Sequence, residues 1–183
     1  MTWYQRWGAV AAPFLLALVR LAVPARAQVA APDTTPLTFV DIPAGASLAS
    51  LSSRMATLGA NPLRCVRSSR DRSVTECRGA FRQRGSTGAV ELWLSAIDSL
   101  AGIITFAHSG SSDRLNEWRG DLERRYGVVP TQVQGAQRMK QWVRRGRMIR
   151  LTWRREAEGT AVSVSLVDGR VLDGWGAKQQ RER

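Results

Sequence analysis

Two cysteines, Cys65 and Cys77, enclose a polar segment and constrain the fold more than any other feature of the sequence. The six residues from Ser68 to Ser73 are serine, arginine and aspartate only, a composition typical of a solvent-exposed turn. Strand-like residues flank this turn on both sides. We therefore predict a β-hairpin with strands near 63–68 and 73–82, in which the cysteines face each other.

The first 27 residues have the three parts of a signal peptide. Arg6 gives a positively charged start, residues 8–19 form an apolar run, and Ala25 and Ala27 supply the small residues that signal peptidase requires before Gln28. The alternative is an uncleaved membrane anchor, but Arg20 ends the apolar run short of the ~20 residues that cross a bilayer. We expect 1–27 to be removed and the mature protein to be periplasmic or extracellular.

Export determines how the cysteines are interpreted. In an oxidising compartment two cysteines form a disulfide far more often than they bind a metal or act as a nucleophile. The sequence has one histidine, His108, so a metal site would lack further ligands. We expect a structural Cys65–Cys77 disulfide, which stabilises such a loop by about 3 kcal/mol in the chain-entropy model, and no metal or other cofactor.

The chain is strongly basic, and its partner is expected to be acidic. Without Arg6, Arg20 and Arg26 of the signal segment, the formal net charge falls from +12 to +9. An excess of this size favours an anionic partner, and export disfavours nucleic acid. An acidic protein or a membrane-associated complex is the expected partner, with a membrane surface as a further option.

Hydrophobic periodicity predicts two helices, each followed by strands. The first has Ser47 as its N-cap and ends at Gly59, and the second follows Ser111 or Ser112 and ends at Gly127. Their apolar stripes are Leu48, Leu51, Met55 and Leu58, and Leu115, Trp118, Leu122 and Tyr126. Further strands are expected near 89–94, 101–106, 138–144, 147–155 and 161–167, with an edge strand at 37–42 and a turn at 85–88.

These segments predict an α+β fold made of two helix-plus-antiparallel-sheet repeats, with the helices packed on one face of the sheet. The expected organisation is a signal peptide (1–27), an extended leader (28–46), a first repeat (47–107), a second repeat (108–177) and a flexible tail (178–183). In this duplication Trp142 and Trp153 take the place of the two cysteines.

Two such repeats, together with cysteines separated by eleven residues and followed by Arg78-Gly79, resemble the beta-lactamase inhibitory protein family. The element order is also similar to that of small outer-membrane-assembly lipoproteins. The resemblance covers the hairpin and the element order, and neither the inhibitors' second disulfide nor the lipoproteins' cysteine has a counterpart here. It implies an α+β fold and a binding role without a particular target.

The sequence offers little support for catalysis, since no nucleotide-binding, zinc or calcium motif is present. His108 precedes a Ser/Gly segment that favours a capping loop, and an envelope hydrolase that uses His108 and this loop is the alternative function. Asp98 and Asp168 follow strands, where aspartate commonly stabilises turns, and this interpretation is preferred over an acid/base pair.

Arginines crowd the strands near 138–144 and 147–155, where Arg150, Thr152 and Arg154 share one face. Solvated arginines are ordinary on an exposed sheet face, but charges this dense repel one another unless an anionic surface neutralises them. We therefore expect a non-enzymatic binding or accessory protein that docks through an arginine-rich sheet face. The candidate partner-binding residues are Arg144, Arg145, Arg147, Arg150, Arg154 and Trp93.

Overall fold

The computed structural model describes residues 35–82 and 88–181. The predicted signal peptide and its cleavage site at Ala27/Gln28 lie outside the described residues. So do the first three residues of the turn predicted at 85–88.

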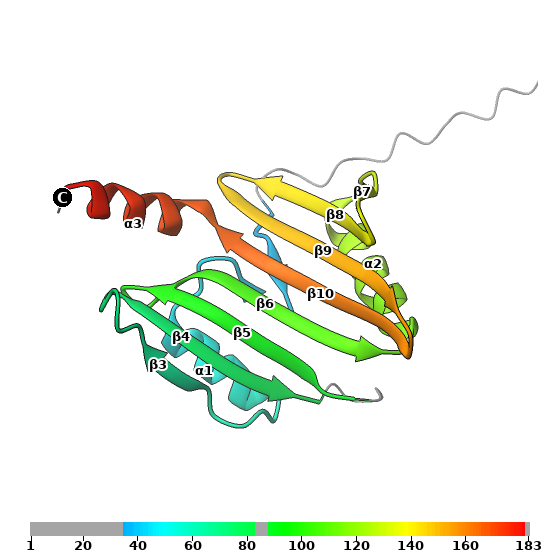
Figure 1. Cartoon of the computed structure of the whole chain (residues 1–183), viewed down its shortest axis with the longest axis horizontal. Helices are drawn as coiled ribbons and strands as arrows, with labels where there is room; N and C mark the ends of the chain where they lie inside the picture. Colours follow the sequence, from blue (N-terminus) through cyan, green and yellow to red (C-terminus); the bar gives the residue numbers. More distant parts are fainter. Residues whose placement is uncertain (1–34, 83–87, 182–183) are drawn as a thin grey trace, which may run out of the picture.

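An antiparallel sheet of eight strands forms the body of the described chain, in the order β3-β4-β5-β6-β10-β9-β8-β7 (Figure 1). Its strands are β3 (Arg64–Arg67), β4 (Val74–Phe81), β5 (Val90–Ile97), β6 (Leu100–Gly110), β7 (Gln132–Gln134), β8 (Gln137–Arg144), β9 (Arg147–Glu156) and β10 (Gly159–Asp168). Strands β6 and β10 pair at the centre. In each half of the sheet, the first strand in the sequence lies at the outer edge and the last lies at the centre.

Helices α1 (Leu48–Thr57) and α2 (Asp113–Tyr126) lie on one face of this sheet, behind it in the view of Figure 1. Each of them precedes four consecutive strands of the sheet. A third helix, α3 (Gly169–Arg181), continues directly from β10. The prediction of an α+β fold is confirmed.

The two predicted helices form where their local signals place them. The Ser47 hydroxyl accepts a hydrogen bond from the backbone N–H of Ser50 (3.2 Å) and caps α1. After α2, Gly127 has a φ of +88°, a conformation that glycine adopts at little cost. Because the apolar residues recur at helical spacing, Leu51 and Met55 of α1 and Trp118 and Leu122 of α2 are buried against the sheet.

The core lies between the helices and the inward side of the central strands. Alternate residues of these strands are fully buried, among them Leu92, Ile104, Phe106, Leu151 and Val164. Phe39 joins the two halves of the core, since its ring centre lies 5.1 Å from those of both Phe106 and Trp118.

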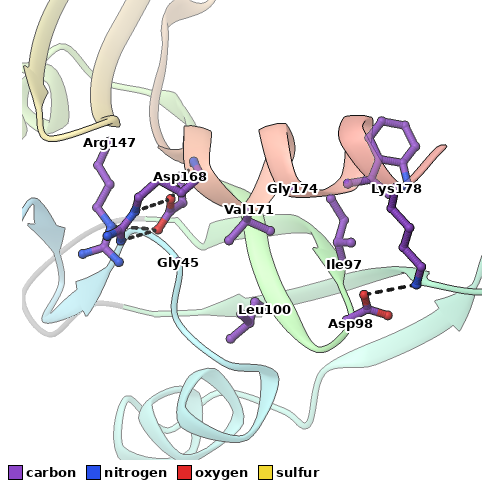
Figure 2. A pocket seen from close by; sticks show the side chains of 11 residues that line it. Gly45, Ile97, Asp98, Leu100, Arg147, Asp168, Val171, Gly174 and Lys178 are labelled. Atoms are coloured by element: carbon purple, nitrogen blue, oxygen red, sulfur yellow. Dashed lines mark hydrogen bonds and ion pairs between the residues drawn. The ribbon is translucent and has the colours of Figure 1, made fainter. Parts of the chain in front are cut away.

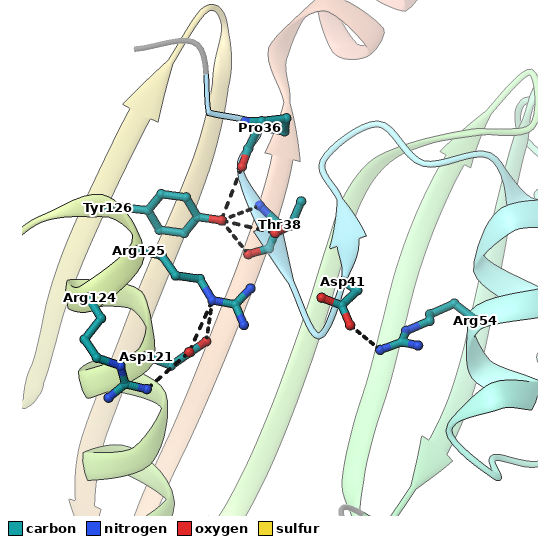
Figure 3. Close-up of polar contacts among 8 residues, drawn as sticks. All are labelled: Pro36, Thr38, Asp41, Arg54, Asp121, Arg124, Arg125 and Tyr126. Carbon is teal, nitrogen blue, oxygen red and sulfur yellow. Dashed lines mark hydrogen bonds and ion pairs between the residues drawn. The ribbon is translucent and has the colours of Figure 1, made fainter. Parts of the chain in front are cut away.

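The leader does not supply the edge strand predicted at 37–42, and that prediction is wrong. Positive φ angles at Val40 and Asp41 instead make a tight turn between β1 (Thr38–Phe39) and β2 (Ile42–Pro43), which pair only with each other. Figure 3 shows how both helices hold this hairpin. The Tyr126 hydroxyl of α2 bonds the backbone N–H and carbonyl of Thr38 (2.8 Å each). Arg54 of α1 donates to the Val40 carbonyl (3.0 Å).

Strand β7 and helix α3 were not predicted. Helix α3 contains three glycines, which lower its intrinsic helix propensity. Contacts with a residue far away in the sequence stabilise this helix. Trp175 and Gln179 both donate a hydrogen bond to Asp71 in the β3–β4 turn (2.7 and 2.9 Å). The segment expected as a tail, 178–183, therefore begins inside a helix.

The tryptophans predicted to replace the disulfide do not face each other. Trp142 of β8 is paired with Ile149, and Trp153 of β9 is paired with Arg138. Strands β3 and β4 are the first two after α1, and β7 and β8 are the first two after α2, whereas Trp142 and Trp153 lie on β8 and β9. The prediction that the tryptophans take the place of the paired cysteines is therefore wrong, because strand β7 was not expected.

Candidate functional site

The disulfide-bonded hairpin β3–β4, at one edge of the sheet, shows which side chains of these strands face away from the helices. Cys65 and Cys77 form the predicted disulfide (S–S 2.02 Å) and are directly paired between β3 and β4. Cys77 is buried against the helices, so the residues beside it in the strand project to the other side. The pair Arg64 and Arg78, next to the disulfide, thus stands on the side away from the helices.

We call the side of the eight-stranded sheet that carries neither α1 nor α2 the open face; it is turned toward the reader in Figure 1. Directly paired residues of adjacent antiparallel strands point to the same face. The strand registers therefore define continuous rows of side chains across the open face. Two adjacent rows contain most of its large side chains.

The first row crosses seven strands and is polar and cationic. Thr105 and Ser165 join its two halves through a hydrogen bond between their hydroxyls (3.0 Å). Arg150 donates to the side-chain oxygen of Gln141 within the row (3.2 Å). In strand order, this cationic row consists of Arg64, Arg78, Trp93, Thr105, Ser165, Arg150 and Gln141.

The second row lies two residues away along each strand and is largely apolar. Several of its side chains are unusually exposed for their type, with Val66 at 72%, Val143 at 60% and Ile103 at 39%. In strand order, this apolar row consists of Val66, Glu76, Ser95, Ile103, Val167, Met148 and Val143.

Small side chains near the middle of the sheet leave two hollows on the open face. A hollow of about 270 Å³ is lined by Arg78, Trp93 and Ile103. A second, of about 140 Å³, is lined by Thr152, Arg154 and Ala161. The open face therefore combines exposed apolar side chains, cationic side chains and two hollows. Recognition sites commonly share these features.

The structure separates the six predicted partner-binding residues. Trp93, Arg150 and Arg154 lie on the open face, with Trp93 39% exposed. Arg145 lies exposed in the β8–β9 turn with a φ of +48°. Alternation along the strands places Arg144 and Arg147 on the helix side.

Arg144 packs against α2 and does not contribute to the open face. Its guanidinium carbon lies 5.3 Å from the centre of the Tyr126 ring. Its Nη2 also donates to the Tyr126 carbonyl oxygen (3.4 Å).

Arg147 belongs to an ion-pair cluster around Asp168 at the end of β10. The Asp168 carboxylate is buried and accepts hydrogen bonds from Arg147 Nε (2.7 Å) and from Nε and Nη2 of Arg170 (3.3 Å each). Burial opposes its ionisation, but the hydrogen bonds from Arg170 and Arg147 outweigh this effect and hold the pKa of Asp168 below its ordinary value. The hydrogen bond between Arg170 and Asp168 raises the pKa of Arg170. Asp168 is thus a buried ion-pair partner.

His108 does not lie in a loop, contrary to the sequence prediction. Strand β6 extends to Gly110, and His108 is buried on its inward side with Nδ1 3.0 Å from the Ala89 carbonyl oxygen. The Ser111 hydroxyl interacts with Asp113 at the start of α2. Within residues 35–82 and 88–181, no group of three His, Cys, Asp or Glu side chains is placed to hold a metal ion.

No family model, curated protein or solved structure matches this chain. In the part of the chain that the structure describes, no helix combines the length and the apolar character needed to cross a bilayer.

Arg78 of β4 and Ile103 of β6 are not among the six predicted partner-binding residues. They come from strands other than those that carry the five predicted arginines, and only the sheet order brings them beside Trp93. The disulfide gave a usable signal for Arg78, since a residue next to an inward-facing cysteine must face outward.

Proposed function

We propose that this protein is an exported, non-enzymatic binding or accessory protein that docks on an acidic protein or a membrane-associated complex through its open face. The observation that carries the proposal is the adjacency of the cationic row and the apolar row on a sheet face that carries neither α1 nor α2.

Exposed apolar side chains support a binding role for this face. Among the described residues, seven large hydrophobic side chains are exposed, and four of them belong to the two rows: Val66, Trp93, Ile103 and Val143. Scattered exposed hydrophobics are ordinary, whereas their concentration on one surface favours an interaction site. Aromatic and arginine side chains, which supply most binding hot spots, lie next to them.

The charges of this face favour an acidic partner. No ion pair among the described residues includes Arg64, Arg78 or Arg150. Carboxylates on a partner would neutralise these cations and give them the bidentate contacts that guanidinium groups favour.

We further infer an internal duplication, supported by the recurrence of one helix followed by four antiparallel strands. Its equivalent strands are β3 to β6 and β7 to β10, which replaces the alignment through the tryptophans. The proposed relation to the beta-lactamase inhibitory protein family rests on the disulfide hairpin and this element order. A disulfide is compatible with an oxidising periplasmic or extracellular location, which supports export.

Photocrosslinking in intact cells tests the proposal. A photoreactive amino acid replaces Trp93 on the open face, and a matched variant carries it at Arg124, which is exposed on α2 on the other side of the sheet. We expect an acidic protein to be captured from position 93 and not from position 124, with capture falling as salt is raised. Equal capture from both positions, or capture that salt does not affect, would contradict the proposal. His108→Ala should leave capture unchanged.

A further inference from the structure

Helix α3 and the turn between β5 and β6 line an open pocket of about 450 Å³, which is shown in Figure 2. This volume falls within the range of about 300–1,000 Å³ that small-molecule sites occupy. The pocket is separate from the open face, because none of its lining residues belongs to the cationic or the apolar row. Its ligand is therefore a question independent of the proposed docking function.

The middle of the pocket is apolar. Ile97 and Leu100 line it from the β5–β6 hairpin, and Val171 and Trp175 line it from α3. Leu100 is 45% exposed, which is unusual for leucine. The Trp175 indole is held in place by its hydrogen bond to Asp71 (2.7 Å). Ile97 is already buried, whereas Val171 and Trp175 are half-buried, so an apolar ligand would remove water mainly from Leu100, Val171 and Trp175.

One glycine keeps the pocket open. Gly174 lies on the pocket side of α3, and a Cβ added there would meet no atom within 4 Å. The helix therefore has an open space where a larger residue would reach into the pocket. A Cβ added at Gly176 would also meet no atom within 4 Å, but Gly176 does not line the pocket.

One end of the pocket has a surplus of positive charge. Arg147 and Arg170 share the single carboxylate of Asp168. Among the described residues, Arg147 uses only Nε for this contact, so its two terminal amino groups keep their hydrogen-bond donors. At the other end Lys178 and Asp98 balance each other (3.7 Å). A single anionic group thus finds complementary charge only at the arginine end.

We propose that this pocket binds an aliphatic carboxylate, with the carboxylate on Arg147 and Arg170 and the hydrocarbon chain along Ile97, Leu100, Val171 and Trp175. The arginine fork matches the planar carboxylate, and the apolar middle accommodates an unbranched chain. Affinity then rises with chain length, by about fourfold for each methylene that the pocket buries.

Calorimetric titration of the mature protein tests this assignment, with hexanoate, octanoate and decanoate as probes below their micelle concentrations. We expect saturable binding that strengthens along this series. Decyltrimethylammonium, which has the same chain and the opposite charge, should bind at least about tenfold more weakly than decanoate. Arg170→Gln should weaken decanoate about tenfold and should not weaken the ammonium probe.

Two helix variants separate filling of the pocket from effects on α3. Gly174→Leu and Gly176→Leu both replace a helical glycine by a strong helix former, so both should stabilise the helix. Only Gly174→Leu should abolish decanoate binding, because its side chain occupies the pocket. The assignment is overturned if the wild type shows no saturable binding, if the ammonium probe binds as tightly as decanoate, or if the two variants weaken decanoate equally. Open-face crosslinking is unaffected by either result.

Discussion

Arg78 of β4 and Trp93 of β5 are directly paired on the open face, so a guanidinium and an indole stand side by side on the same surface. Neither α1 nor α2 covers them, and Trp93 is 39% exposed, whereas Trp118 of α2 is 3% exposed. Paired side chains of this kind lie close enough to contact one partner together. The two tryptophans therefore have different roles, one on the surface and one in the core.

We predict that Trp93→Ala lowers the free energy of unfolding by less than about 1.5 kcal/mol, because water already reaches much of the side chain. Trp118→Ala should cost about 3–5 kcal/mol, since it leaves a cavity beside Phe39. Urea unfolding followed by circular dichroism measures both values. A loss at Trp93 as large as that at Trp118 would show that Trp93 is needed for folding and would weaken its role as a binding residue.

The disulfide should account for a large part of the stability of the hairpin edge. Cys65 and Cys77 are twelve residues apart, and closing such a loop stabilises the folded state by about 3 kcal/mol in the chain-entropy model. We expect wild type in reductant, and Cys65→Ala/Cys77→Ala in any buffer, to lose about this amount in urea unfolding. Reductant should not change the double variant. If reductant destabilises both proteins equally, the effect does not come from this bond.

The elements that were correctly predicted are those whose signals are local. The apolar stripe of α1, its Ser47 cap and Gly59 lie within one short segment, so periodicity and capping chemistry were sufficient. The register of the hairpin followed from two cysteines that have to face each other. The shared face of Arg150 and Arg154 followed from alternation along β9.

What the sequence did not predict depends on contacts between distant residues. Helix α3 has three glycines, and its anchor Asp71 lies 104 residues before Trp175. The rows of the open face depend on the order of strands in the sheet, which alternation within one strand does not reveal. Arg147 was assigned to the docking surface from composition, whereas burial of Ile149 and Leu151 turns it toward Asp168.

The ion-pair cluster should make stability depend on pH through Asp168. Its pKa lies below the ordinary value of about 3.9 because, although burial opposes ionisation, the hydrogen bonds from Arg170 and Arg147 prevail. The stabilisation is therefore fully present above about pH 5 and is lost as pH falls through the lowered folded-state pKa.

We predict that Asp168→Asn lowers the free energy of unfolding by about 1–2 kcal/mol at pH 7, a modest loss because both arginines remain partly in contact with water. Its difference from wild type should shrink below about pH 4. Asp98→Asn is the control, since its pair with Lys178 is exposed, and it should change stability by less than about 0.5 kcal/mol. A deficit at Asp168→Asn that stays constant down to pH 2 would show that its cause is not the carboxylate charge.

Two glycines offer a matched test of how closely the leader packs on this cluster. Gly45 and Gly59 both have positive φ angles, +81° and +70°, so alanine is strained at either position. A Cβ at Gly59 would meet no atom within 4 Å, whereas one at Gly45 would overlap the Asp168 carboxylate and lie 3.2 Å from Arg147 Nη2.

Gly59→Ala should therefore cost about 1 kcal/mol from backbone strain alone. Gly45→Ala should cost about 2–4 kcal/mol, because it also displaces the buried ion pair. Urea unfolding at pH 7 gives both values, and repeating it with Asp168→Asn in each background shows whether the excess at Gly45 comes from the carboxylate. If it does, the two substitutions at 45 and 168 are less than additive. Equal losses at Gly45 and Gly59 would mean that the leader does not press against Asp168 in solution.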